Sequence, residues 1–218
     1  MARSPALDRF LELAAQRLLP SPPPGSDVND DAAHGAIHGD HAFSPNLEAE
    51  FPAGAGKPAA VLIPIVDRSE GPTVLFTQRS GALRSHSGQI AFPGGRIDPG
   101  DDGPLGAALR EAEEEIGLAR RFVAPIGYLD LYLTTSGYRI VPVVAQIEPG
   151  FTLALNKDEV EDTFECPLEF LMAEANHRRE SREWRGAMRS YYAMPFGERY
   201  IWGVTAGILR SLFERIHR

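Results

Sequence analysis

Hydrophobic positions along the chain fall into blocks whose spacing changes between that of strands and that of helices. Residues 60–66 are almost continuously apolar, as expected of a buried strand, and residues 73–77 follow as a second strand after a Gly71-Pro72 turn. Further strand-like runs cover residues 123–133, 138–147 and 159–166. The strands are interspersed with helical segments, which favours an α/β protein.

Helical spacing of apolar residues appears near both ends of the chain and once in the middle. The apolar positions of residues 5–19 predict an amphipathic helix that docks on the domain or on a partner subunit. A second helix starts around Pro104 and ends before Gly117, a typical C-terminal cap. The remaining predicted elements are a short helix in residues 167–175, a hairpin in residues 182–194 and a final helix in residues 203–217.

Two segments read as connections rather than as regular structure. Residues 20–58 are rich in Pro, Gly, Asp and His and lack periodicity, which predicts an irregular arm. Residues 78–91 form a polar connection to a Phe92-Pro93-Gly94-Gly95 turn. We therefore expect an N-terminal helix and arm in residues 1–57 and one domain in residues 58–218, since 218 residues suffice for one sizeable core.

Charge and composition narrow the partners and the compartment. The net charge of −8 gives no bulk attraction to nucleic acid or to anionic lipid. No apolar run approaches the length of a membrane span, and the N-terminus lacks the apolar core of a secretory signal. Cys166 is the only cysteine, so it cannot form an intramolecular disulfide, and we expect a small buried residue there. The expected location is the cytoplasm, with no nucleic-acid or membrane partner.

Residues 110–118 read Arg-Glu-Ala-Glu-Glu-Glu-Ile-Gly-Leu and concentrate acids where a plain helix would not. At roughly 100° per residue, Glu111, Glu114 and Glu115 share one helix face. Each like-charge pair costs about 0.2–0.5 kcal/mol, and the macrodipole disfavours acids in a last helical turn. A solvated acidic face is the plain alternative. The Gly-rich turn upstream instead favours a compensating cation, and clustered hard oxygen atoms suit Mg²⁺ or Mn²⁺.

The acidic stretch resembles the Nudix box, G-x5-E-x7-R-E-U-x-E-E-x-G-U, in which U is a bulky apolar residue. The second half of the box is filled by Arg110, Glu111, Glu114, Glu115, Gly117 and Leu118, with Ala112 at the first apolar position. The first half is one residue longer than the consensus. Its acid is Asp101 when counted from Gly95 and Asp102 when counted back from Arg110. The resemblance implies a Nudix-type α/β/α sandwich with a mixed sheet.

A second resemblance lies just upstream of the box. The pattern of Leu75-Phe76-Thr77-Gln78-Arg79-Ser80, then Arg84, Gly88 and Phe92-Pro93-Gly94-Gly95, is similar to the signature of coenzyme A pyrophosphatases within the Nudix superfamily. The longer box is also similar to that subfamily. Guanidinium groups bind phosphate bidentately, so Arg79 and Arg84 are candidates for holding substrate phosphates.

The Nudix resemblance implies roles for the acids and glycines. Glu111 and Glu115 match the principal metal ligands, Glu114 assists them, and the carbonyl of Gly94 matches a backbone ligand. Without a Cβ, Gly94 and Gly95 also let the backbone approach a metal or a phosphate, whereas a simple tight turn is the alternative.

Two further residues are candidates for supporting the chemistry. Arg110 can reach Glu114 one helical turn away and orient it. Glu159 is the candidate general base, because a Glu from a later loop often serves this role in Nudix enzymes; a surface acid is the alternative.

The sequence thus predicts metal-dependent hydrolysis of the pyrophosphate bond of coenzyme A or its derivatives, giving 3′,5′-ADP and 4′-phosphopantetheine species. Two alternatives remain open. One is a Nudix pyrophosphatase for another nucleotide, such as ADP-ribose or a nucleoside triphosphate. The other is a non-catalytic module that binds a nucleotide, although such modules usually lack some of the acids. Homodimers are common in the resembled family, so a homodimer is an open expectation.

Overall fold

The structure is a computed structural model that describes residues 3–26, 37–39, 56–83, 85–184 and 187–217. The helices are α1 (Pro5–Arg17), α2 (Gly103–Ile116), α3 (Leu168–Leu171) and α4 (Gly203–His217), with short 3₁₀ turns at Arg120–Phe122 and Glu174–Asn176. The strands are β1 (Ile37–Gly39), β2 (Lys57–Val66), β3 (Thr73–Arg79), β4 (Ile90–Ala91), β5 (Gly94–Arg96), β6 (Val123–Tyr128), β7 (Leu131–Leu133), β8 (Tyr138–Ile147), β9 (Val160–Pro167), β10 (Arg178–Trp184), β11 (Ala187–Phe196) and β12 (Arg199–Trp202).

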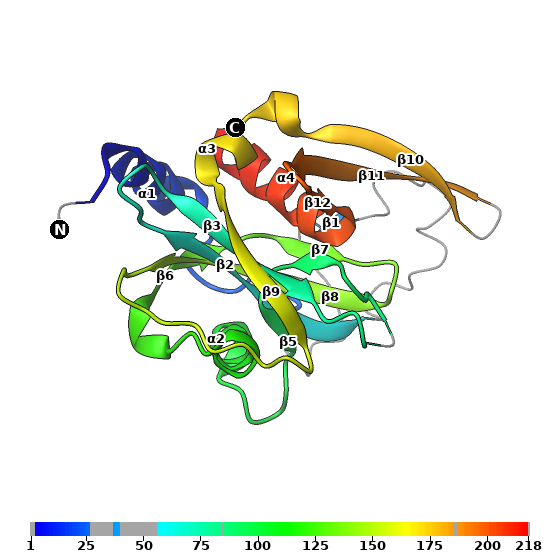
Figure 1. The fold of residues 1–218 in the computed structure, drawn as a ribbon, viewed down its shortest axis with the longest axis horizontal. Coiled ribbons are helices and arrows are strands. Elements are labelled where there is room, and N and C mark those ends of the chain that lie inside the picture. Colours follow the sequence, from blue (N-terminus) through cyan, green and yellow to red (C-terminus); the bar gives the residue numbers. More distant parts are fainter. Residues whose placement is uncertain (1–2, 27–36, 40–55, 84, 185–186, 218) are drawn as a thin grey trace.

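A mixed sheet forms the middle layer of an α/β/α sandwich, which confirms the expected fold class. The main strand order is β1-β7-β8-β2-β3-β4, while β5 also pairs with β2, β6 with β8 and β9 with β3. The two longest neighbours, β2 and β8, are parallel, and most other pairs are antiparallel. Helix α2 lies on one side of this sheet, and α1, α4 and the β10–β12 sheet lie on the other (Figure 1).

Strand β2 is buried on both faces, as its continuous apolar run predicts. Ala59, Ile63 and Ile65 pack into the core shared with α1 and α4. The alternating residues Ala60, Leu62 and Val66 pack into a second core against α2. The period of two along one strand therefore divides the molecule into its two hydrophobic layers.

Helix α1 docks on the domain through the apolar stripe seen in the sequence. The buried residues of this stripe are Leu7, Phe10, Ala14 and Leu18, which share a core with α4. The side chain of Ser4 caps the helix by accepting a hydrogen bond from the amide of Leu7 at 3.3 Å. The helix ends at Arg17, two residues earlier than expected, because Leu18 is extended and Leu19 pairs with Tyr128.

The predicted start and end of α2 are confirmed. Pro104 lies in the first helical positions, and Gly117 ends the helix in the left-handed conformation with φ of +70°. The burial of Cys166 is confirmed as well. None of the helices in the described part of the chain combines the length and apolarity needed to cross a membrane.

Several boundaries differ from the sequence prediction. The run in residues 123–133 is divided into β6 and β7, because Pro142 of the facing strand has no amide hydrogen to continue the ladder. The polar connection of residues 78–91 contains β4 and the end of β3. The predicted short helix in 167–175 is divided into α3 and the start of the 3₁₀ turn at Glu174–Asn176, and the predicted hairpin belongs to a three-stranded sheet.

The predicted arm, residues 20–58, is only partly within the described residues. Residues 37–39 add β1 to the edge of the main sheet, parallel to β7. Three residues reading Ile-His-Gly carry no periodic signal, so pairing with β7 defines this strand and local pattern does not. Residues 27–36 and 40–55 lie outside the described part of the chain.

Candidate active site

Arg110 on α2 donates hydrogen bonds to several of the acids around it. Its guanidinium donates two hydrogen bonds to the carboxylate of Asp101, from Nε to Oδ1 at 2.9 Å and from Nη2 to Oδ2 at 3.0 Å. These bonds hold the pKa of Asp101 below its usual value. Asp102 makes no side-chain capping bond at the start of α2. Asp101 is therefore the acid that ties the preceding loop to the helix.

The same guanidinium also contacts two of the three clustered glutamates. Nη1 of Arg110 donates to Oε1 of Glu111 and to Oε2 of Glu114, both at 3.0 Å. The Glu114 side chain is 57% exposed, whereas that of Glu111 is 16% exposed. Arg110 thus restrains Glu114 at the surface while Glu111 reaches inward.

Glu115 is the buried member of the cluster, with only 3% of its surface exposed. Its Oε2 accepts a hydrogen bond from the backbone amide of Gly94 at 3.2 Å. Burial raises the pKa of this carboxyl to about 8, and the charge of Glu111 adds to the rise, although the Gly94 amide and Arg79 oppose it. An additional cation beside this buried carboxyl would stabilise its ionised form.

Gly94 and Gly95 lie in strand β5, opposite Val61 and Ala60 of β2, so the expected tight turn is wrong at these two residues. Gly94 has φ of +154°, and a Cβ there would lie 2.4 Å from the carbonyl oxygen of Ala60. A Cβ on Gly95 would lie 2.4 Å from Oε1 of Glu111. The two glycines therefore let β5 fit between β2 and the acidic face of α2.

Glu159 lies at the end of an exposed turn that is tied to α2. The amides of Ala154 and Asn156 donate to the last carbonyls of the helix, those of Ile116 and Glu115, both at 2.9 Å. Negative charge on Glu159 contributes to the raised pKa values of Glu111 and Glu115. The loop thus brings a third acid near the two inner glutamates.

A cavity of about 670 Å³ opens beside these residues. Its walls include Gly94 and Gly95, and also Arg79 from the end of β3. The Nε atom of Arg79 is buried and makes no hydrogen bond within the described residues. Arg84, the second predicted phosphate-binding arginine, lies outside the described residues.

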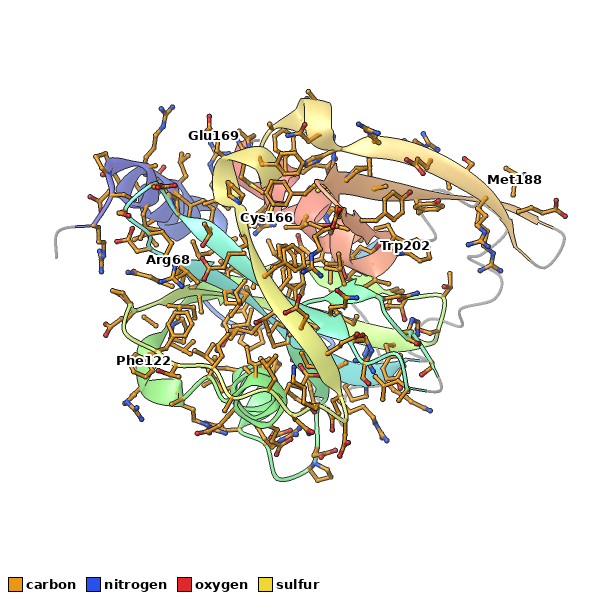
Figure 2. The ribbon with its side chains drawn as sticks, in the orientation of Figure 1. Arg68, Phe122, Cys166, Glu169, Met188 and Trp202 are labelled. Carbon is orange, nitrogen blue, oxygen red and sulfur yellow. The ribbon has the colours of Figure 1, made fainter. Side chains whose placement is uncertain are left out.

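The structure also brings residues to the cavity that the sequence did not single out. They come from β5, the β7–β8 turn, the β10–β12 sheet and the start of α4, and include Arg96, Thr134, Arg182, Arg189, Trp202 and Thr205. Figure 2 labels Trp202 where β12 meets α4. The sequence does show two arginines, Arg182 and Arg189, in the predicted hairpin. It does not show that both line one cavity, because that depends on how the hairpin packs against the rest of the fold.

The donor set at the acidic cluster fits a hard divalent ion. Across the described residues, no three Asp, Glu, His or Cys side chains gather closely enough to hold an ion between them. Two inner carboxylates, Glu111 and Glu115, both have raised pKa values, with burial as the largest cause. Mg²⁺ is commonly bound by one or two carboxylates together with water and substrate phosphates. The buried Glu115 and the half-buried Glu111 supply the two carboxylates of such a site, next to Gly94 and Gly95 of the cavity wall.

Comparison with known proteins identifies the family. The family model described as NUDIX domain matches residues 56–186. A protein of Photorhabdus laumondii named "Uncharacterized Nudix hydrolase NudL" is 39% identical over 158 residues, which cover 72% of this chain and 84% of the relative. The protein of the same name from Escherichia coli O7:K1 is 41% identical over 158 residues, with 72% and 82% covered.

Solved structures with a similar fold include DR0079 from Deinococcus radiodurans, with a TM-score of 0.47 and 16% identity over 77% of this chain and 88% of that one. A C. elegans Ap4A hydrolase has a TM-score of 0.45 and 21% identity, and covers 51% of this chain and 80% of its own. The family model covers more than half of the chain, and the two relatives are each about 40% identical over 158 residues. The chain therefore belongs to the Nudix family, and it is a Nudix hydrolase.

Proposed function

We propose that this Nudix hydrolase cleaves the pyrophosphate bond of coenzyme A or of its derivatives, giving 3′,5′-ADP and a 4′-phosphopantetheine species. The observation that carries the proposal is the position of Arg79. This arginine belongs to the stretch that resembles the coenzyme A pyrophosphatase signature, and it lines the same cavity as Gly94 and Gly95. Its buried Nε makes no hydrogen bond to any residue that the structure describes, which suits it to a substrate phosphate.

Nudix hydrolases generally use divalent metals such as Mg²⁺ or Mn²⁺. In this chain Glu111 and Glu115 would hold the ion, with the carbonyl of Gly94 as the backbone ligand that the family resemblance implies. A bound divalent ion neutralises pyrophosphate charge and lowers the pKa of a coordinated water.

The remaining residues support these ligands and the substrate. Arg110 holds Glu111 and Glu114 through two hydrogen bonds of 3.0 Å, and its pair with Asp101 fixes the guanidinium. Glu159 would accept the proton of the attacking water. Its side chain is exposed to solvent, and its negative charge raises the pKa values of both Glu111 and Glu115. Arg79 would neutralise the charge on the phosphate that is attacked.

A substrate panel tests this function. Purified protein is incubated with coenzyme A, ADP-ribose, diadenosine polyphosphates and nucleoside triphosphates, under Mg²⁺ and under Mn²⁺, and the products are identified by mass spectrometry. We expect 3′,5′-ADP from coenzyme A as the most efficiently formed product. If coenzyme A stays intact while another compound is cleaved, the chain is a Nudix pyrophosphatase of different specificity. No turnover of any compound, with binding retained, would indicate the non-catalytic module.

The Arg79→Gln variant tests the residue that carries the proposal. Loss of a charge-assisted phosphate contact should raise KM for coenzyme A about tenfold or more. The matched control is Arg121→Gln, an exposed arginine that does not line the cavity. An Arg79→Gln enzyme with unchanged kcat and KM would remove the assigned role of Arg79.

A further inference from the structure

Two arginines stand directly opposite each other in the β10–β11 hairpin. Arg182 of β10 pairs in register with Arg189 of β11, and both line the 670 Å³ cavity. Like charges at directly opposed positions of an antiparallel pair repel and destabilise it. An anion bound between the two side chains would offset this repulsion and would lie in the cavity.

The described part of the cavity lining is basic, although the chain as a whole is acidic. The described residues that line it include four arginines and no Asp or Glu, whereas the whole chain has a net charge of −8. Strand β10 carries two acids, and Glu180 is the one on the same strand face as Arg182. Glu180 accepts a hydrogen bond from the hydroxyl of Tyr200 at 2.5 Å, and neither Glu180 nor Glu183 lines the cavity. A cavity lined by one sign of charge concentrates ligands of the opposite sign.

The arginine pair comes from a different part of the fold than the catalytic residues. Arg79, Gly94 and Gly95 belong to the main sheet, while Arg182 and Arg189 belong to the separate β10–β12 sheet. Figure 2 labels Met188, the neighbour of Arg189, near the free end of that hairpin, well away from β5. An anion held by the pair is thus distinct from the pyrophosphate near Gly94.

Aromatic residues of the same small sheet complete this region of the cavity. Tyr191 and Trp202 both line the cavity, with ring centroids 5.4 Å apart in an edge-to-face arrangement. Such rings offer flat surfaces on which a nucleobase can stack. A base beside a second anion is the arrangement found in a nucleotide whose ribose carries its own phosphate.

We propose that Arg182 and Arg189 form a second anion subsite, which binds a phosphomonoester on the ribose of the substrate while Arg79 binds the pyrophosphate. The substrate class is then a nucleotide that carries a ribose phosphate in addition to the pyrophosphate. Guanidinium pairs suit such a group because each can bind the phosphate oxygens bidentately. For coenzyme A, the inference rests on the proposed function and assigns the 3′-phosphate to this pair.

Binding of product-like nucleotides tests the subsite without turnover. Calorimetric titration of the full chain compares 3′,5′-ADP and 2′,5′-ADP with 5′-AMP. We expect at least one bisphosphate to bind about tenfold tighter than 5′-AMP, and Arg182→Gln to abolish that preference. The isomer that binds better identifies the ribose position. Equal affinity of all three compounds for the wild-type chain would overturn the proposal.

A matched control separates a specific contact from a general charge effect. Arg178 lies on β10, two pairs along the same strand face from Arg182, is exposed, and does not line the cavity. Arg178→Gln should keep the preference for the bisphosphate. If Arg178→Gln and Arg182→Gln reduce it equally, the arginine pair is not the subsite. Unchanged melting temperatures of both variants verify that the fold persists.

Kinetics then distinguish failure of the subsite from failure of the proposed function. The readout is the ratio of kcat/KM for coenzyme A to that for 3′-dephospho-coenzyme A. Arg182→Gln should lower this ratio about tenfold, and Arg178→Gln should leave it unchanged. If coenzyme A is cleaved but the ratio does not change in Arg182→Gln, the subsite is wrong and the function stands. If coenzyme A is not cleaved while the bisphosphate preference depends on Arg182, the function is wrong and the subsite stands.

Discussion

Glu115 is both a buried residue of the fold and a proposed ligand of the divalent ion. Its carboxyl is buried and accepts a hydrogen bond from the backbone amide of Gly94, and its pKa is raised to about 8. Glutamine has the same shape and can accept the same hydrogen bond without carrying charge. Glu115→Gln should therefore melt at the wild-type temperature or above in the absence of metal, while turnover with Mg²⁺ falls by about 10²-fold or more.

The control for this variant is Glu113→Gln on the same helix. The Glu113 side chain is 53% exposed and its ion-pair partner is Arg120, away from the cavity. Turnover and the midpoint of thermal unfolding should both match the wild type. Full activity of Glu115→Gln would show that the buried acid is structural, and the proposed ion site would be wrong.

Asp101 and Asp102 are adjacent acids with different environments. Asp101 shares two hydrogen bonds with Arg110 and its side chain is 6% exposed, while Asp102 makes no capping bond. Asp101→Asn should lower the free energy of unfolding by about 1–3 kcal/mol, the cost of hydrogen bonds to a charged group. Asp102→Asn should change it by less than about 0.5 kcal/mol. Urea unfolding of both variants measures the difference, and equal effects would contradict it.

Helical periodicity predicted which acids share a face of α2, but it could not predict their depth. Glu114 and Glu115 are neighbours in the sequence, yet one is exposed and the other has 3% exposure. The difference arises because β5 packs over Glu115, and that contact depends on the pairing of β5 with β2. Arg182 and Arg189 were missed for a similar reason, since a cavity wall is a tertiary feature.

At the scale of elements, β5 fits between β2 and α2 because of its two glycines. A Cβ on Gly94 would meet the backbone of Ala60, which cannot move without breaking the strand pair. A Cβ on Gly95 would meet only the end of the Glu111 side chain, which can rotate away. Gly94→Ala should therefore destabilise the fold by more than about 1 kcal/mol. Gly95→Ala should fold but lose activity, because Glu111 is displaced.

Thermal unfolding and turnover of the two variants provide the test. The control is Gly100→Ala, where a Cβ meets nothing within 4 Å. If Gly95→Ala proves less stable than Gly94→Ala, the backbone contact at Ala60 is not the dominant constraint on β5.

His177 connects the loop after α3 to helix α4 and should make stability depend on pH. Its Nε2 donates to the carbonyl of Leu171 at 2.7 Å, and its ring lies edge-on to Phe213. Burial lowers the pKa of His177 below 6.5, so the folded state favours the neutral ring. The stabilising contribution is complete above pH 6.5. As pH falls below 6.5, the unfolded chain takes up the proton first and the contribution is lost.

Urea unfolding between pH 5 and pH 8 tests this dependence. We expect the wild-type midpoint to fall more steeply below pH 6.5 than that of His177→Gln, which has no titrating ring. His217 is the matched control, since its ring is exposed at the end of α4. Parallel pH profiles for the wild type and His177→Gln would exclude the buried ring as the cause.

Sequence patterns predicted the elements whose own residues carry a clear hydrophobic or capping signal. They did not predict the strands that form only by pairing with a neighbouring strand. The continuous apolar run of β2 and the capped helix α2 were recognisable from residue order alone. Strands β1, β4 and β5 are two or three residues long and exist only through their neighbours. The interruption between β6 and β7 depends on Pro142 in the facing strand, which the run of 123–133 does not contain.

At the scale of the whole molecule, the N-terminal helix and the C-terminal helix share one hydrophobic layer. Phe10 of α1 packs in the same buried cluster as Leu212 and Ile216 of α4. The guanidinium of Arg215 also donates to the carbonyl of Arg17 at 2.6 Å and to Asp130 at 3.0 Å. We therefore propose that α1 belongs to the same folding unit as residues 58–218.

Phe10→Ala tests whether α1 unfolds together with α4 and the rest of the domain. Truncation of a buried Phe costs about 3–5 kcal/mol when the surroundings cannot collapse, so the free energy of unfolding should fall by that amount in one cooperative transition. Glu12→Ala, an exposed change on the same helix, should cost less than about 0.5 kcal/mol. Because the cavity is lined by β12 and the start of α4, the loosened layer should also raise KM before the enzyme unfolds. A variant that loses α1 in a separate, earlier transition while KM stays constant would instead make the helix an independent appendage.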